Sequence, residues 1–113
     1  MDIVYHNQVA LLDFKIMRVK ITDDSRYDEI MRLVFRRIKL LESDFNGTFS
    51  DPCEYPPLIG WRKHRFHVGI DQEPDMRIIF KLMKGTILIL AIGFHNYVYK
   101  EAERRDQRSF KQL

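Results

Sequence analysis

Two strongly β-forming runs separated by a two-residue turn constrain the fold of this chain more than any other feature. The runs are MRIIFKLM at 76–83 and TILILAIG at 86–93, with Lys84-Gly85 between them. A turn dipeptide between two such runs predicts a β-hairpin whose register follows the alternating apolar residues. The second run is apolar on both faces, which is typical of a central strand covered on both sides. The hairpin is therefore the predicted centre of a sheet.

Three further segments and a final helix are predicted to complete the fold. Residues 14–21 alternate apolar and basic side chains, which predicts a first strand. Residues 25–43 carry a capping box and then apolar residues at helical spacing, which predicts a helix with one apolar face. Residues 61–68 alternate and predict a strand, and the segment after Gly93 is amphipathic and predicts a helix. The expected fold class is α+β: a small, mainly antiparallel sheet of about four strands, packed on the N-terminal helix and followed by a C-terminal helix.

The remaining segments show no regular period. Residues 1–12 are interpreted as an N-terminal extension whose apolar residues pack back on the domain or bind a partner. Residues 46–60 contain three prolines and predict a long loop. Residues 69–75 are predicted to be a polar turn and 107–113 a tail. The whole chain, 1–113, is expected to be one domain, because a chain of this length buries about two thirds of its unfolded surface.

The composition is that of an ordinary globular protein, with 45% hydrophobic and 31% charged residues. No apolar run approaches the roughly 18 residues that cross a bilayer, and the N-terminus lacks the pattern of a secretory signal. We therefore expect a cytoplasmic protein with no membrane partner. Cys53 is the one cysteine, which excludes an intramolecular disulfide and a multi-cysteine zinc site. No cofactor and no metal are expected.

The charge distribution is uneven although the net charge is only +3. The isoelectric point is about 9.1. Such unevenness predicts a basic face, as expected for a nucleic-acid partner or an acidic protein partner, and a solvated surface of mixed charge explains it equally well. The acidic residues collect in 23–29, 42–54 and 71–75, and the basic residues in 32–39, 61–67, 77–84 and 100–111.

Four short motifs occur in a characteristic order. They are H-R-F-H-V-G, M-R-I-I-F, I-L-A-I-G and V-Y-K-E-A-E-R-R. Together they resemble the RelE/ParE superfamily of bacterial toxins from type II toxin–antitoxin pairs, over roughly residues 14–106. For RelE-like members the resemblance implies an endoribonuclease that cleaves mRNA in the ribosomal A site by attack of the 2′-OH on the phosphodiester. It also implies a cognate antitoxin as partner, with a higher-order toxin–antitoxin complex as a further option.

The resemblance implies a cationic site on the open face of the sheet. Lys63 and Arg65 match the basic residues of the family's second strand, and Arg77 matches the arginine that opens its third strand. A guanidinium is permanently cationic and binds phosphate through two parallel hydrogen bonds. Arg65 and Arg77 are therefore expected to bind phosphate and stabilise transition-state charge, with Lys63 adding to the same field.

Three further residues match the family's site. His95 lies where the family often has an arginine, two residues after the strand-end glycine, and an imidazole suits general acid or base catalysis near neutrality. Tyr99 matches the tyrosine of the V-Y pair and is expected to stack on a base or orient the nucleotide. Glu54, in the long loop, suits a general base, since some relatives have a glutamate there.

Two other functions remain open. A ParE-like, non-enzymatic inhibitor of DNA gyrase has the same fold, and a plain protein-binding module would use the basic groove for an acidic helix. The presence of His95 beside the cations favours the nuclease, because a gyrase inhibitor has no need of a proton-transfer residue there. The residues expected to have structural roles are His64 and His67 on a strand surface, and Trp61 and Tyr97 in packing.

Overall fold

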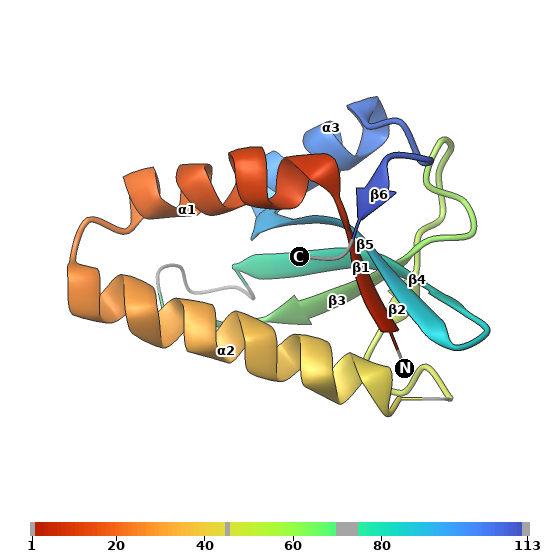
Figure 1. Cartoon of the computed structure of the whole chain (residues 1–113), viewed down its shortest axis with the longest axis horizontal. Coiled ribbons are helices and arrows are strands. Elements are labelled where there is room, and N and C mark those ends of the chain that lie inside the picture. The colour runs from red at the N-terminus through yellow and green to blue at the C-terminus, as the bar shows by residue number, and fades with distance from the viewer. Residues whose placement is uncertain (1, 45, 70–74, 112–113) are drawn as a thin grey trace.

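The computed structural model describes residues 2–44, 46–69 and 75–111 and has helices on both sides of a mixed sheet (Figure 1). The predicted α+β class is confirmed. The strands are β1 (Asp2–His6), β2 (Asp51–Pro52), β3 (Arg62–Phe66), β4 (Met76–Met83), β5 (Thr86–Phe94) and β6 (Phe110–Lys111). The helices are η1, a π-helical turn (Val9–Asp13), α1 (Phe14–Lys20), α2 (Asp24–Glu42) and α3 (His95–Arg104).

The sheet is built outward from the hairpin β4–β5, as the sequence predicts. Its strand order is β2-β3-β4-β5-β1-β6. β5 pairs antiparallel with β4 and parallel with β1, so it has a neighbour on each side. Gly85 in the hairpin turn has φ +76°, a conformation that favours glycine. The predicted turn and central strand are therefore both confirmed.

Helix α2 agrees closely with the helix predicted over 25–43. The side chain of Asp23 caps its N-terminus by accepting a hydrogen bond of 2.8 Å from the backbone N–H of Arg26. The helix buries one stripe of side chains against the sheet, at spacings of three and four residues. These side chains are Ile30, Val34, Ile38 and Leu41.

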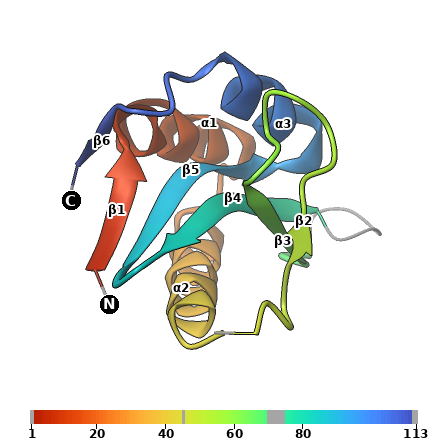
Figure 2. The same cartoon turned by 90° about the vertical axis from the view of Figure 1, so that its right-hand side faces the viewer.

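The two faces of the sheet are covered by different helices (Figure 2). On one face, the stripe of α2 and Met17 of α1 pack on strand residues such as Ile78 and Ile89. On the opposite face, α3 packs through Val98 and Ala102. Apart from a bulge in β5, where Leu90 and Ala91 enter the same layer, the residues of each strand alternate between the two layers. Basic residues at odd-numbered positions of β3 and β4 therefore share the face of α3.

Residues 14–20 form helix α1, so the strand predicted over 14–21 is wrong. In α1 the side chain of Met17 is fully buried and Ile21, four residues later, is 3% exposed, which is helical spacing. Val19 is 76% exposed, although alternation would place it with Met17 and Ile21 on one face. The chain therefore has two successive helices before the loop, where a single helix was expected.

The two ends of the chain take part in the sheet. Within 1–12, interpreted as an extension, β1 pairs with β5 and the buried Tyr5 and Val9 join the core, so these residues pack back on the domain. Within 107–113, interpreted as a tail, β6 pairs antiparallel with β1. The long loop contains the two-residue strand β2. The polar turn predicted over 69–75 lies largely outside the described residues.

Three side chains with predicted structural roles can be compared with the model. Trp61 is 1% exposed in the core under α3, and Tyr97 packs against the same cluster of buried residues, so both predictions are confirmed. His64 is 3% exposed, so its predicted position on the strand surface is wrong. In the described part of the chain, no helix is long and apolar enough to span a membrane.

Candidate functional site

The cations predicted for the site lie on the sheet face that α3 partly covers. In the register of β3 and β4, Arg65 is directly opposite Arg77 and Lys63 is opposite Ile79. Because side chains alternate along a strand, Lys63 and Arg65 point to the same side as Arg77. Like charges directly opposite each other destabilise a strand pair, so a bound anion would relieve the repulsion between the two arginines.

Gly93 allows α3 to approach this face closely. It is directly opposite Arg77 in the register of β4 and β5. A Cβ atom at Gly93 would lie 2.6 Å from the Cδ1 atom of Tyr97, which is too close for any side chain. The glycine that ends the I-L-A-I-G motif therefore fixes the distance between the first turn of α3 and the arginines.

One face of α3 presents a row of polar side chains toward the site. His95, Tyr99 and Glu103 are spaced by four residues, so they lie on the same side of the helix. The Nε atom of Arg77 donates a hydrogen bond of 3.1 Å to the hydroxyl oxygen of Tyr99. This bond joins β4 to the middle of α3 and fixes the tyrosine beside the guanidinium.

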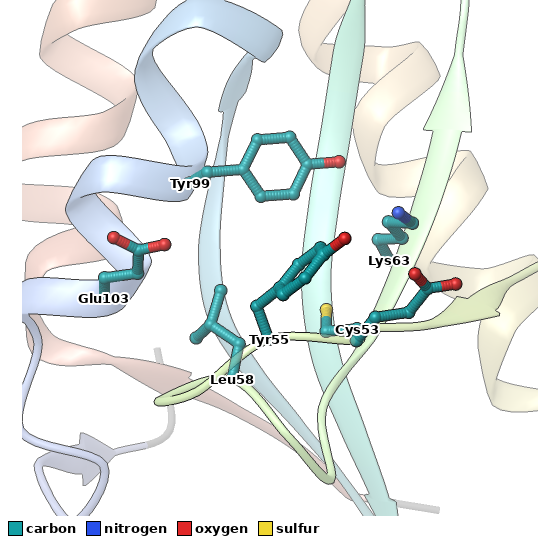
Figure 3. A pocket seen from close by; sticks show the side chains of 7 residues that line it. Cys53, Tyr55, Leu58, Lys63, Tyr99 and Glu103 are labelled. Atoms are coloured by element: carbon teal, nitrogen blue, oxygen red, sulfur yellow. The ribbon is translucent and has the colours of Figure 1, made fainter.

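A pocket of about 300 Å³ opens beside Tyr99, between α3 and the long loop (Figure 3). In Figure 3 Tyr99 projects from α3 across the pocket toward Lys63, and Tyr55 rises from the loop below it. The pocket therefore combines two aromatic rings with a cation, and adds two acidic side chains. Its lining residues are Cys53, Glu54, Tyr55, Leu58, Lys63, Tyr99 and Glu103.

Arg65 lies at the rim of this region and forms an ion pair with β2. Its Nη2 atom is 3.3 Å from Oδ2 of Asp51. The side chains are 51% and 57% exposed, so water screens the pair and its net stabilisation is small. A phosphate can therefore replace Asp51 as the partner of Arg65 at little cost.

His95 is the first residue of α3, one turn before Tyr99. Its backbone N–H donates a hydrogen bond of 3.1 Å to the carbonyl oxygen of Asp75, which ties the helix start to the beginning of β4. Its ring nitrogen Nδ1 is buried and has no hydrogen-bond partner among the described residues. His95 is half-buried and is not among the residues that line the pocket.

A buried ion pair anchors the far end of α3. Nη2 of Arg105 is 2.5 Å from Oδ1 of Asp13, and both side chains are at most 3% exposed. Asp13 also accepts hydrogen bonds from the Tyr97 hydroxyl at 2.6 Å and from the backbone N–H of Ile92 at 2.9 Å. Burial and the hydrogen bond to Asp13 raise the pKa of Tyr97 far above its usual value. This network holds α3 against β5 and η1.

The chemistry of the remaining pocket residues is limited. Burial raises the pKa of the Cys53 thiol, against the opposing effect of Lys63 and Arg62, so the thiol stays protonated near neutrality. Within residues 2–44, 46–69 and 75–111, no group of three or more histidine, cysteine, aspartate or glutamate side chains is arranged to hold a metal ion. The reactive groups that the site offers are therefore guanidinium, ammonium, imidazole, carboxylate and phenol.

Comparison with known proteins identifies the architecture. No protein-family model matches the sequence, and no curated protein matches it. A solved structure of YafQ from E. coli strain BL21(DE3) superimposes with a TM-score of 0.52 at 22% identity, over 84% of this chain and 93% of YafQ. The chain has the YafQ fold. A point mutant of YafQ superimposes with a TM-score of 0.50 over the same shares of the two chains and at the same identity.

The fold shared with YafQ agrees with the α+β fold that the motifs predict. Of the residues predicted for the site, Glu54, Lys63 and Tyr99 line one pocket. Arg77 touches Tyr99, and Arg65 lies opposite Arg77. The sixth, His95, is one helical turn away. Their roles remain predictions.

Sequence reasoning missed several residues of the site. Glu103 and Tyr55 line the pocket, and Asp51 is the partner of Arg65. The spacing of Glu103 from Tyr99 on a predicted helix is a local signal that identifies it. Asp13 gives no such signal, because its partner Arg105 is 92 positions away in the sequence.

Proposed function

We propose that this protein is the toxin of a type II toxin–antitoxin pair and acts as a ribosome-dependent mRNA endonuclease. Its fold, shared with YafQ from E. coli, supports a toxin of the RelE family. The four motifs of the sequence point to the same class. Cleavage of mRNA by such an enzyme needs cations, an aromatic ring and proton-transfer groups on one surface.

The contact between Arg77 and Tyr99 carries this proposal. It brings a guanidinium and an aromatic ring together, with Arg65 directly across the strand pair. A single-stranded nucleotide presents both a phosphate and a flat base, and proteins bind such strands with cations for the backbone and aromatic rings for the bases. The arrangement therefore supports a ribonucleotide whose phosphate lies on the arginines and whose base lies against Tyr99.

The proposed reaction is transfer of the phosphodiester to its own 2′-oxygen. The 2′-oxygen bonds to phosphorus and its proton passes to a base, while the bond to the 5′-oxygen breaks and that oxygen takes a proton from an acid. A 2′,3′-cyclic phosphate and a 5′-hydroxyl result. Arg65, Arg77 and Lys63 would stabilise the charge that develops on the phosphorane, where fixed cations are most effective.

Two residues are proposed for proton transfer. Glu54 lines the pocket beside Lys63 and can accept the 2′-OH proton. His95 lies one turn from Tyr99 on the same side of α3 and can donate to the leaving 5′-oxygen, or accept in place of Glu54. Because His95 is half-buried, substrate must approach the first turn of α3 for this transfer.

The proposed partners are mRNA on the ribosome and a cognate antitoxin protein. The same cations that would hold RNA attract an acidic or amphipathic protein segment, which would cover the face beside α3 and block the site. Such an antitoxin would compete directly with RNA. The protein would then be inactive in the complex and active when the antitoxin is removed.

Purified protein added to ribosomes carrying a defined message tests the function. Cleavage of the message in the A site by the wild type, and none by Arg77→Ala, supports the nuclease. The matched control is Lys100→Ala on the exposed side of α3, which should cleave normally. Inhibition of gyrase supercoiling without cut mRNA would instead identify a ParE-like inhibitor, and neither activity would identify a protein-binding module.

A further inference from the structure

The two carboxylates in the pocket are unexpected at a surface proposed to bind phosphate. Glu54 and Glu103 both line the pocket with Lys63. Neither glutamate makes a hydrogen bond or ion pair with any other residue that the structure describes. A carboxylate repels a phosphate. An unpaired carboxylate in this pocket is therefore suited to contact a part of a nucleotide other than its phosphate. Glu54 has a proposed role in proton transfer, whereas Glu103 has none.

The position of Glu103 relative to Tyr99 is fixed by the helix. Residues four apart on a helix have Cβ atoms about 5–6 Å from each other and lie on one side. The Tyr99 hydroxyl is held by Arg77, so the ring cannot swing away from the pocket without breaking that bond. A base resting against the ring would extend along α3, and its outer edge would reach Glu103.

A carboxylate is selective among the four bases because it only accepts hydrogen bonds. Guanine presents two neighbouring donors, N1–H and the N2 amino group, which match the two carboxylate oxygens. Adenine and cytosine each present one amino group beside an acceptor, and uracil presents one N–H between two carbonyls. Carboxylate pairing with base donors is a recognised form of sequence reading.

We propose that this pocket is a guanine subsite, in which Tyr99 supports the base and Glu103 accepts hydrogen bonds from its Watson–Crick edge. The inference rests on the proposed function, because the guanine belongs to the single-stranded RNA on the sheet. The volume, about 300 Å³, is at the lower end of the range of about 300 to 1,000 Å³ for small-molecule pockets, which suits a single base. Tyr55, 75% exposed on the loop side, provides a second ring for the opposite face of the base.

Binding of mononucleotides to the purified protein, followed by NMR, tests the subsite without any nuclease activity. GMP should bind most tightly, IMP, which lacks the N2 amino group, more weakly, and AMP and UMP weakest. Glu103→Gln should weaken GMP binding by about tenfold and remove the preference for GMP over IMP. The matched control, Glu29→Gln on the exposed side of α2, should bind like the wild type.

Ribosome cleavage assays separate this inference from the function on which it rests. Messages that differ only at one position of the A-site codon should be cut fastest with guanine at that position, and Glu103→Gln should cut all four equally. Equal cleavage of all four by the wild type, with no preference for GMP, would overturn the subsite and leave the nuclease. Preferential GMP binding without any cleavage would overturn the nuclease and leave the subsite. Circular dichroism of Glu103→Gln checks that the variant is folded.

Discussion

The guanidinium of Arg77 and the hydroxyl of Tyr99 are joined by a hydrogen bond of 3.1 Å. Arg77 lies near the start of β4, and Tyr99 lies in the middle of α3. The bond unites two groups that single-stranded RNA binding requires, a phosphate ligand and a ring for a base. It also orients both groups before any ligand binds. Preorganised groups stabilise a transition state without the cost of reorganisation.

Arg77→Ala combined with Tyr99→Phe should relieve growth arrest on expression and lower the rate of mRNA cleavage by about a hundredfold or more. The substitution removes a guanidinium from the proposed phosphate site and the hydroxyl that orients it. Arg77→Lys should cleave mRNA at a rate between those of the wild type and the double variant, because an ammonium keeps the charge and loses the two parallel hydrogen bonds. Full toxicity of the folded double variant would count against this site.

Binding of a short single-stranded RNA should depend on salt through the cations of the sheet. Lys63→Ala and Arg65→Ala should each reduce the slope of log affinity against log salt concentration by about 1, because each removes one phosphate contact. Fluorescence anisotropy at several salt concentrations measures the slope. Lys100→Ala, an exposed lysine on α3, is the matched control. An unchanged slope in both variants would exclude these residues from the RNA path.

Asp13→Asn should lower the free energy of unfolding by about 3–5 kcal/mol, measured by urea denaturation. The substitution removes the charge that compensates the buried Arg105, whose side chain is 3% exposed. Because domains are stable by only about 5–15 kcal/mol, this loss is a large share of the total stability. Arg104 directly precedes Arg105 and its side chain is 74% exposed, so Arg104→Ala should change the free energy of unfolding by less than about 0.5 kcal/mol. A loss below about 1 kcal/mol for Asp13→Asn would show that the pair is not a main anchor.

Stability should fall as pH is lowered through the range where histidine titrates. Burial lowers the pKa of both His64 and His6 below their ordinary value of 6.5. The unfolded chain then binds more protons than the folded protein just below pH 6.5, so acidification favours unfolding, and the stabilisation is complete above that pH. Unfolding free energies at pH 7.5 and at mildly acidic pH, about 5.5, measure the effect.

His64→Asn tests one contribution to this pH dependence. The Nδ1 atom of His64 lies 2.6 Å from the carbonyl oxygen of Phe49, and an asparagine amide can donate to the same oxygen without titrating. The variant should therefore lose less stability on acidification than the wild type. His67→Asn, an exposed position near the end of the same strand, should keep the wild-type pH dependence. The reverse result would mean that His64 is not responsible.

The elements that could be predicted from the sequence are those with local signals. The hairpin β4–β5 has a turn dipeptide between two apolar runs, and α2 has an N-cap followed by a helical stripe, so their positions followed directly. The alternation of 61–68 assigned Lys63 and Arg65 to one face of their strand, and the family resemblance added Arg77. The register of β3 and β4 places Arg65 directly opposite Arg77. A period of two is a reliable guide where a strand has one covered and one open face.

Other elements depend on contacts that local patterns do not reveal. Residues 14–20 alternate by chance, because Val19 is an exposed apolar residue of a helix that buries Met17. β1 joins β5 in parallel, and parallel pairs have no short connecting turn that marks them in a sequence. β6 is only two residues long. Asp51 was missed for a related reason, since its place in the site is defined by Arg65 on another strand.

The ion pair between Asp13 and Arg105 links residues 92 positions apart. Protein synthesis is vectorial, so the aspartate emerges from the ribosome long before its arginine exists. Until then the carboxylate must stay hydrated, because burial of an uncompensated charge is prohibitively costly. The first helices therefore cannot pack stably on the sheet during translation. The domain completes its folding only after the residues that follow α3 have left the exit tunnel.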